Sequence, residues 1–145
     1  MEIFKGTMNQ LDALVDLELE LWPHDTRDQL LEKTQEQLHS ADHVFYMIKQ
    51  ERSFIAFIHM SIRKGYVERA VASLTGYIEG IYVKSDFRRK GVAQNLVEAA
   101  ELWAKAKGCK QIGSDTELSN QPGYSFHIEA GFHEANRTIS FIKDL

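Results

Sequence analysis

A basic, glycine-containing stretch in the middle of the chain has the composition of an anion-binding turn. It reads Arg88-Arg89-Lys90-Gly91-Val92-Ala93 and lies between a predicted strand that ends at Val83 and a predicted helix that begins near Val92. The first N–H groups of a helix have no partner within the helix and the helix dipole is positive there, so main-chain donors can hold a pyrophosphate. Gly91 and Ala93 leave room for this approach. A solvated basic turn before a surface helix would look the same, because patterns this short also occur by chance.

Two acidic residues are candidates for binding and deprotonating a cationic group. Asp115 directly follows a predicted strand, Cys109 to Ser114, and ligands of α/β sheets usually bind at the carboxyl ends of strands. A carboxylate there can attract an ammonium group and accept its proton, directly or through water. Glu79 lies between apolar neighbours inside a predicted strand, so its carboxylate needs a polar or charged partner. By strict alternation it would share a face with three neighbours: Tyr77, Ile81 and Val83. An Asp that caps the next helix and a Glu that faces solvent are the structural alternatives.

The elements that would position these residues can be predicted from capping residues and periodicity. Thr7 with Gln10 three residues later has the form of a capping box, and Thr26 or Asp25 can cap a second helix after Pro23. Apolar and β-branched runs predict the strands. The predicted strands after these helices are His43 to Lys49, Ser53 to Arg63, Leu74 to Val83, Cys109 to Ser114 and Thr138 to Lys143. Helices are predicted from Val92 to Gly108 and from Ser125 to Ala130. This interleaving predicts an α/β fold with parallel pairing around Val83 and Ile112.

Composition narrows the class of protein. The 145 residues are 43% hydrophobic and 26% charged, which predicts one domain over residues 1–145. The net charge of −4 gives no general attraction to nucleic acid, and no apolar run approaches the roughly 20 residues that span a membrane. We therefore expect a cytoplasmic protein. Cys109 is the lone cysteine, so no internal disulfide forms, and the six histidines lack metal-ligand spacing, so we expect no metal.

Several motifs together resemble the GNAT superfamily of N-acetyltransferases. They are the strand Glu79-Gly80-Ile81-Tyr82-Val83, the basic turn, the helix after it and Glu129-Ala130-Gly131-Phe132. The resemblance implies a mixed central β-sheet flanked by helices, with acetyl-CoA wedged between splayed parallel strands. It also implies which residues bind the cofactor. The coenzyme A pyrophosphate would lie on Arg88, Arg89, Lys90, Gly91, Val92 and Ala93, the pantetheine arm along Ile81, Tyr82 and Val83, and a further contact on Asn120.

A closer resemblance, over nearly the whole chain, is to the aminoglycoside 6′-N-acetyltransferases. The residues that carry it are Leu21-Trp22-Pro23, Ser61-Ile62-Arg63, Tyr66-Val67, Ser114-Asp115-Thr116 and Gly131-Phe132. It implies direct transfer of acetyl from acetyl-CoA to the 6′-amine of an antibiotic, which inactivates the drug, and a homodimer that forms through Thr138 to Lys143. Asp115 would be catalytic. The substrate would contact Trp22, Tyr66, Glu79, Asp115 and Asn136.

The sequence departs from this pattern at two positions and leaves alternatives open. His127 stands where many relatives have a tyrosine that protonates the leaving thiolate, and it is either that acid or a structural histidine. Asn136 stands where related enzymes have an acidic residue. No acetyl-enzyme is expected, because Cys109 begins a strand far from the basic turn. The alternatives are acetylation of another amine, such as a polyamine or a protein N-terminus, and a coenzyme A-binding module without turnover.

Overall fold

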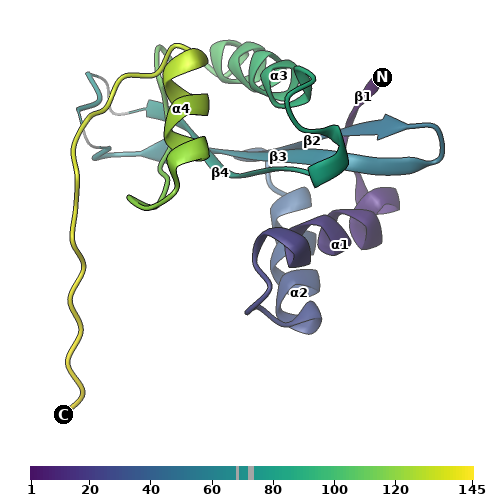
Figure 1. The fold of residues 1–145 in the computed structure, drawn as a ribbon, viewed down its shortest axis with the longest axis horizontal. Coiled ribbons are helices and arrows are strands. Elements are labelled where there is room, and N and C mark those ends of the chain that lie inside the picture. The colour runs from purple at the N-terminus through teal and green to yellow at the C-terminus, as the bar shows by residue number, and fades with distance from the viewer. Residues whose placement is uncertain (68, 72–73) are drawn as a thin grey trace.

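The computed structural model describes residues 1–67, 69–71 and 74–145 (Figure 1). The first half of the chain supplies two helices and three strands, and the second half alternates strand and helix. The elements are β1 (Glu2–Lys5), η1 (Met8–Gln10), α1 (Leu11–Leu21), α2 (Arg27–Leu38), β2 (His43–Gln50), β3 (Ser53–Lys64), β4 (Leu74–Val83), η2 (Ser85–Phe87), α3 (Val92–Ala106), β5 (Ile112–Gly113) and α4 (Gln121–Glu129).

The described strands form a five-stranded mixed sheet in the order β1-β2-β3-β4-β5. The pairs from β1 to β4 are antiparallel, while β5 lies parallel to β4. The mixed sheet confirms the predicted fold class. The parallel pairing lies elsewhere than predicted, because Ile112 pairs with Gly76 near the start of β4 and not with Val83 at its end.

Helices cover both faces of the sheet (Figure 1). On the face of α1 and α2, a buried cluster consists of Leu14, Leu17, Phe45, Met47 and Phe57. On the opposite face α3 packs its apolar stripe, which includes Leu96, Val97 and Ala100, against strand residues such as Ile58. Burial of these side chains holds both layers to the sheet.

Local capping explains where the first helices begin. Thr7 caps η1 and Thr26 caps α2, and each forms a complete capping box with the glutamine three residues on, Gln10 and Gln29. Each box satisfies two backbone N–H groups that the helix leaves free. Both predicted starts are confirmed.

The C-terminal part differs most from the prediction. The strand predicted from Cys109 to Ser114 contracts to Ile112–Gly113, and α4 begins at Gln121, not Ser125, because Asn120 caps it and Pro122 fits its first turn. The strand predicted from Thr138 to Lys143 is wrong for this chain. Residues 130–145, all of them described, form no helix or strand and run away from the body (Figure 1). A β pattern becomes a strand only where another strand accepts its hydrogen bonds.

Candidate active site

A β-bulge in β4 decides which way the central side chains face. The pairs Met60–Ile78 and His59–Gly80 leave Glu79 as an extra residue on β4. Ile78 before the bulge and Ile81 and Val83 after it all join the α3 cluster. The alternation therefore breaks at the bulge. The prediction that Glu79 shares a face with Ile81 and Val83 is wrong.

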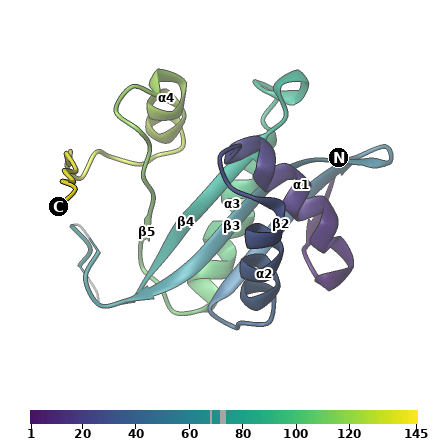
Figure 2. The same cartoon turned by 90° about the horizontal axis from the view of Figure 1, so that it is seen from below.

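Beyond its short pairing with β5, β4 has an open edge. The described parallel pairs end at Tyr77–Gly113, whereas β4 continues to Val83, and the two strands diverge (Figure 2). Because Lys84 N–H donates to Ile55 O on β3, alternation directs the backbone groups of Ile81 and Val83 toward the diverging side. Ile81 thus offers its backbone to this gap, Val83 offers its N–H because its carbonyl already accepts from Arg88, and the backbone of Tyr82 faces β3.

The basic turn presents a helix N-terminus to solvent. Gly91 is the N-cap of α3 with φ of 79°, in the left-handed region, and Arg89 also has a left-handed φ of 61°. No side chain caps α3 within the described residues, and apart from Gly91 and its two chain neighbours no described atom lies within 4 Å of the place where a Cβ on Gly91 would stand. The backbone donors at the start of α3 are therefore accessible to an anion. The side chain of Arg88 points back toward β4, because its Nε donates a hydrogen bond to Val83 O over 2.8 Å.

Asn120 uses its side chain to begin α4. Its Oδ1 accepts a hydrogen bond from Gly123 N at 3.0 Å, and its Nδ2 donates to Thr116 Oγ1 at 3.1 Å. These bonds give Asn120 a structural task. Its predicted contact with a cofactor stays a prediction.

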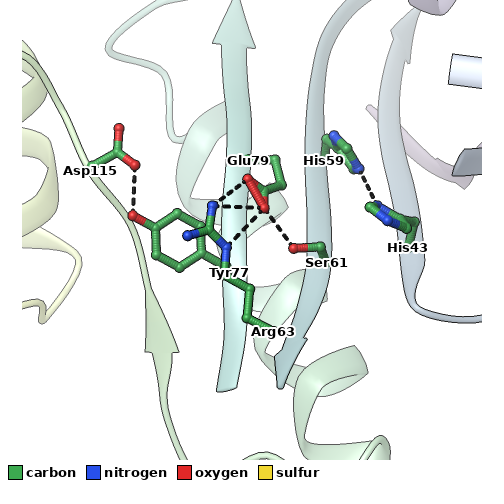
Figure 3. A network of polar contacts seen from close by, with 7 residues as sticks. All are labelled: His43, His59, Ser61, Arg63, Tyr77, Glu79 and Asp115. Atoms are coloured by element: carbon green, nitrogen blue, oxygen red, sulfur yellow. Dashed lines mark hydrogen bonds and ion pairs between the residues drawn. The ribbon is translucent and has the colours of Figure 1, made fainter. Parts of the chain in front are cut away.

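Glu79 is the centre of a polar network on the sheet face of α1 and α2 (Figure 3). Arg63 Nη2 donates to Glu79 Oε1 over 2.8 Å, and Ser61 Oγ donates to Oε2 over 2.7 Å. Burial alone would raise the pKa of Glu79, but the bonds from Arg63 and Ser61 outweigh it and hold the pKa below its ordinary value. Glu79 is therefore an anion with a cation already beside it.

A tyrosine joins this network to the second acidic candidate. Tyr77 donates its hydroxyl to Asp115 Oδ2 over 2.6 Å, and the guanidinium carbon of Arg63 lies 3.5 Å from the centroid of the Tyr77 ring (Figure 3). Asp115 and Glu79, predicted separately, thus belong to one connected group. Sequence reasoning did not assign Tyr77, Arg63 or Ser61 to the site; Ser61 and Arg63 stood in a motif, but only strand pairing shows their contact with Glu79.

An open cleft of about 1070 Å³ runs beside Asp115 between the end of β3, the start of β4 and the C-terminal segment. Its lining includes Arg63, Tyr66, Tyr77, Asp115 and Asn136. Tyr66 is 83% exposed there, and Asn136 is exposed as well. Three of the predicted substrate contacts therefore share one cleft.

Trp22 lies apart from that lining, against β4. It follows the last residue of α1, and its indole covers Gly80, where an added Cβ would come within 2.7 Å of the ring. Its ring also meets Phe57 edge to face at 6.3 Å. Glycine at position 80 is therefore required for this packing, which sets Trp22 one residue from Glu79 along the strand.

His127 has both ring nitrogens engaged. Its Nδ1 lies 2.6 Å from Gly123 O and its Nε2 lies 2.7 Å from Ser114 Oγ. Because a carbonyl can only accept, Nδ1 carries a proton, and Nε2 lies within hydrogen-bond distance of the Ser114 hydroxyl, which can donate or accept. These contacts tie α4 to the end of β5, and they favour the structural alternative for this histidine.

Among the residues that the structure describes, Cys109 and the pair of His43 and His59 form no second site. Burial raises the pKa of the Cys109 thiol. Burial, with His43 close by, lowers the pKa of His59 to about 3, and the two rings meet through nitrogens 2.9 Å apart. Within the described part of the chain, no three His, Cys, Asp or Glu side chains gather as metal ligands, and no helix has the length and apolarity to cross a membrane.

Comparison with known proteins assigns this chain and its fold to a class. The sequence matches the Acetyltransferase (GNAT) family over residues 11–132, and the chain belongs to that family. It is 34% identical to the aminoglycoside N(6′)-acetyltransferase type 1 of Acinetobacter baumannii, over 100% of this chain and 99% of the relative. The corresponding protein of Acinetobacter genomosp. 13 is 38% identical over 86% of each chain. Within the GNAT family, the chain belongs with the aminoglycoside N(6′)-acetyltransferases.

Solved structures support the same assignment. The structure of AAC(6′)-Iy in complex with the bisubstrate analog CoA-S-monomethyl-acetylneamine superposes with a TM-score of 0.93. The two sequences are 30% identical, and the match covers 99% of this chain and 98% of that one. That protein therefore binds a bisubstrate analog in which coenzyme A is joined to an acetylneamine group.

Proposed function

We propose that this chain transfers the acetyl group of acetyl-CoA directly to the 6′-amino group of aminoglycoside antibiotics, within a ternary complex, and so inactivates them. The observation that carries the proposal is a pair of carboxylates: Asp115 lines an open cleft, and Glu79 is joined to it through Arg63 and Tyr77. Polyamine sugars are cationic, so carboxylates and aromatic walls are the groups that would recognise them.

The proposed roles follow the chemistry of each group. Asp115 accepts the proton of the attacking amine, while Glu79, Trp22, Tyr66 and Asn136 contact the sugar rings. Bound acetyl-CoA supplies a thioester whose acetyl group is transferred. The backbone edge from Ile81 to Val83 would hold its pantetheine arm, and the residues of the turn, Arg88, Arg89, Lys90, Gly91, Val92 and Ala93, its pyrophosphate, with Asn120 as a further contact.

The decisive experiment is turnover of the purified protein with acetyl-CoA and kanamycin, tobramycin or amikacin, with the acetylated nitrogen located by NMR. Acetylation at the 6′ nitrogen that falls at least about 100-fold in Asp115→Ala is expected for loss of a general base. Asp28→Ala, at an exposed position on α2, is the matched control and should keep full activity. Turnover unchanged in Asp115→Ala would refute the catalytic role.

Two alternatives predict different outcomes of the same assay. A GNAT enzyme for another amine would acetylate spermidine or a peptide N-terminus and leave every aminoglycoside unmodified. A coenzyme A-binding module would bind acetyl-CoA and turn over none of these amines. The identity with aminoglycoside enzymes favours the first proposal over both.

We also propose that the chain forms a homodimer through residues 138–143. Three apolar side chains in this segment, Ile139, Phe141 and Ile142, are 76%, 90% and 96% exposed. Their burial against a second copy would remove the largest exposed apolar stretch of the C-terminal segment from water. Sedimentation should give a dimer for the full chain and a monomer for a chain that ends at Arg137. A full chain that sediments as a monomer would refute the proposal.

We also propose that the chain is located in the cytoplasm. Fractionation of cells that express the chain tests this. Recovery with the membrane or the medium would contradict it.

A further inference from the structure

Asp115 occupies a weakly anchored part of the backbone. It is exposed and follows β5, whose described pairing with β4 consists of only two residue pairs. A base must be held within a fraction of an ångström of its working position, because misplacement by about 1 Å can cost 100-fold in rate. The backbone around Asp115 offers little such restraint, so a side-chain contact must provide it.

Tyr77 is placed to provide that contact. It pairs with Gly113, the last residue of β5, and its hydroxyl reaches Asp115 two residues further on, at 2.6 Å. The ring crosses Gly113 so closely that a Cβ there would lie 2.9 Å from Tyr77 Cδ2. The missing side chain of Gly113 thus allows the ring to lie across β5 and reach the carboxylate.

The ring of Tyr77 is itself fixed from β3. The guanidinium carbon of Arg63 lies 3.5 Å from the ring centroid, close enough for a cation–π contact. Arg63 in turn is held by Glu79 through both Nε and Nη2. A ring restrained at both sides loses little further freedom when its hydroxyl binds Asp115, which makes the tether stiff.

The hydroxyl of Tyr77 also keeps its proton. Burial and the hydrogen bond to Asp115 raise the pKa of the phenol well above its ordinary value. Throughout the neutral range Tyr77 is therefore a donor and Asp115 the acceptor. A hydrogen bond to a charged acceptor is among the stronger ones in proteins.

We infer that Tyr77 is a positioning residue, whose hydroxyl, braced by Arg63 and Glu79, holds the Asp115 carboxylate in the orientation needed to accept the proton of the amine. The inference rests on the proposed function, in which Asp115 is the base. It assigns no contact with the substrate to the hydroxyl itself. Loss of the hydroxyl should therefore lower kcat through Asp115 and leave acetyl-CoA binding unchanged.

The test compares Tyr77→Phe with Tyr46→Phe. Phenylalanine keeps the ring and its contact with Arg63 and removes one oxygen. We expect Tyr77→Phe to lower kcat for kanamycin about 10-fold, on the order of the free energy of a hydrogen bond to a charged group, with KM for acetyl-CoA unchanged and the protein still folded. Tyr46, on β2 away from the cleft, is the matched control and should keep full activity.

A double-mutant cycle separates positioning from a structural role. In the Asp115→Ala background, Tyr77→Phe should change kcat less than about two-fold, because its effect passes through the missing carboxylate. If Asp115→Ala has no measurable turnover, the same cycle on the dissociation constant of kanamycin, with coenzyme A bound, gives the coupling. Equal losses in both backgrounds, or no loss in Tyr77→Phe, would overturn the inference. Wild-type protein inactive on every aminoglycoside would instead refute the proposed function.

Discussion

The part of the chain before β5 and the part from β5 onward differ in how much apolar surface they bury. Up to Ala106, two helical layers bury a continuous set of apolar side chains on both faces of the sheet. From Ile112 onward, β5 has two residues, α4 buries none of its residues fully, and the described segment from 130 to 145 is mostly exposed. The first region owes its order to its own core. The second packs only a few partly buried side chains, such as Phe126 and Phe132, against that core, and single polar contacts such as Tyr77 to Asp115 add to its restraint.

This contrast explains where the predicted chemistry lies. Asp115 and Asn136 both come from the second region, whereas Glu79 and Trp22 stand on the packed body. A site built across such a boundary has a rigid side, formed by residues of the packed body, and a more mobile side, formed by residues of the second region. Substitutions in the two regions should therefore differ sharply in their effect on stability.

The largest effect is expected in the body, at Phe57. This side chain is 0% exposed and packs among the residues of α1, β2 and β3. Phe57→Ala should lower the free energy of unfolding by about 3–5 kcal/mol, through lost burial and the cavity that remains. Urea denaturation measures the change. A loss below about 1 kcal/mol would mean that the body is not the rigid region.

A second prediction concerns a charge buried inside the body. Glu18 is 2% exposed and accepts a hydrogen bond from Thr34 Oγ1 at 2.7 Å. Burial raises its pKa to about 7 in the folded state, above the ordinary 4.5. Below pH 4.5 both states hold the proton; as pH rises toward 7 the unfolded chain releases it first, so the free energy of unfolding falls, by up to about 3 kcal/mol.

The variant Glu18→Gln removes this titration. It should flatten the dependence of stability on pH between 5 and 7 and be more stable than the wild type at pH 8, as thermal unfolding at several pH values would show. Glu36→Gln, at an exposed position on α2, should leave the slope intact. Parallel curves for wild type and Glu18→Gln would contradict the prediction.

At the boundary between the regions, Gly113→Ala should have an intermediate effect. The new methyl group would meet the Tyr77 ring at 2.9 Å and force the ring or β5 to move. We expect about 1–3 kcal/mol of lost stability from overpacking, together with lower turnover, since the ring would no longer reach Asp115. Wild-type turnover in a folded Gly113→Ala protein would show that the placement of the ring does not matter.

The smallest effect on stability is expected in the C-terminal segment, at Phe141. This side chain is 90% exposed, so Phe141→Ala should change the free energy of unfolding by less than about 0.5 kcal/mol when wild type and variant are compared as monomers. The same urea titration used for Phe57→Ala gives the value. A loss comparable to that of Phe57→Ala would erase the contrast between the regions.

The sequence predicted correctly those features that depend on residues close together in the chain. The capping boxes at Thr7 and Thr26 and the basic turn that opens α3 depend on residues a few positions apart, and the structure has all three. The α/β class also followed from the order of strands and helices, whereas the mixed sheet came from the family resemblance. Register followed from neither, because the extra residue at Glu79 depends on how β3 and β4 fit together.

The polar network was beyond the sequence for a related reason. Tyr77 has the pattern of an ordinary strand residue, and its contacts come from three elements that meet only in the folded chain: β3, β4 and the segment after β5. The strand predicted over 138–143 shows the converse error: the residue types predicted an element that the structure does not form. Its residues favour a strand, but propensity supplies no neighbour.

The ion pair between Arg63 and Glu79 also has a consequence for the energetics of any cationic ligand. Such a ligand does not meet a bare anion, because a guanidinium already compensates the charge. When such a ligand binds Glu79, its ion pair with Glu79 replaces the ion pair between Arg63 and Glu79. The net free energy of binding is therefore the difference between the energies of two similar ion pairs. Glu79 would therefore discriminate between cationic ligands by their geometry more than by their charge.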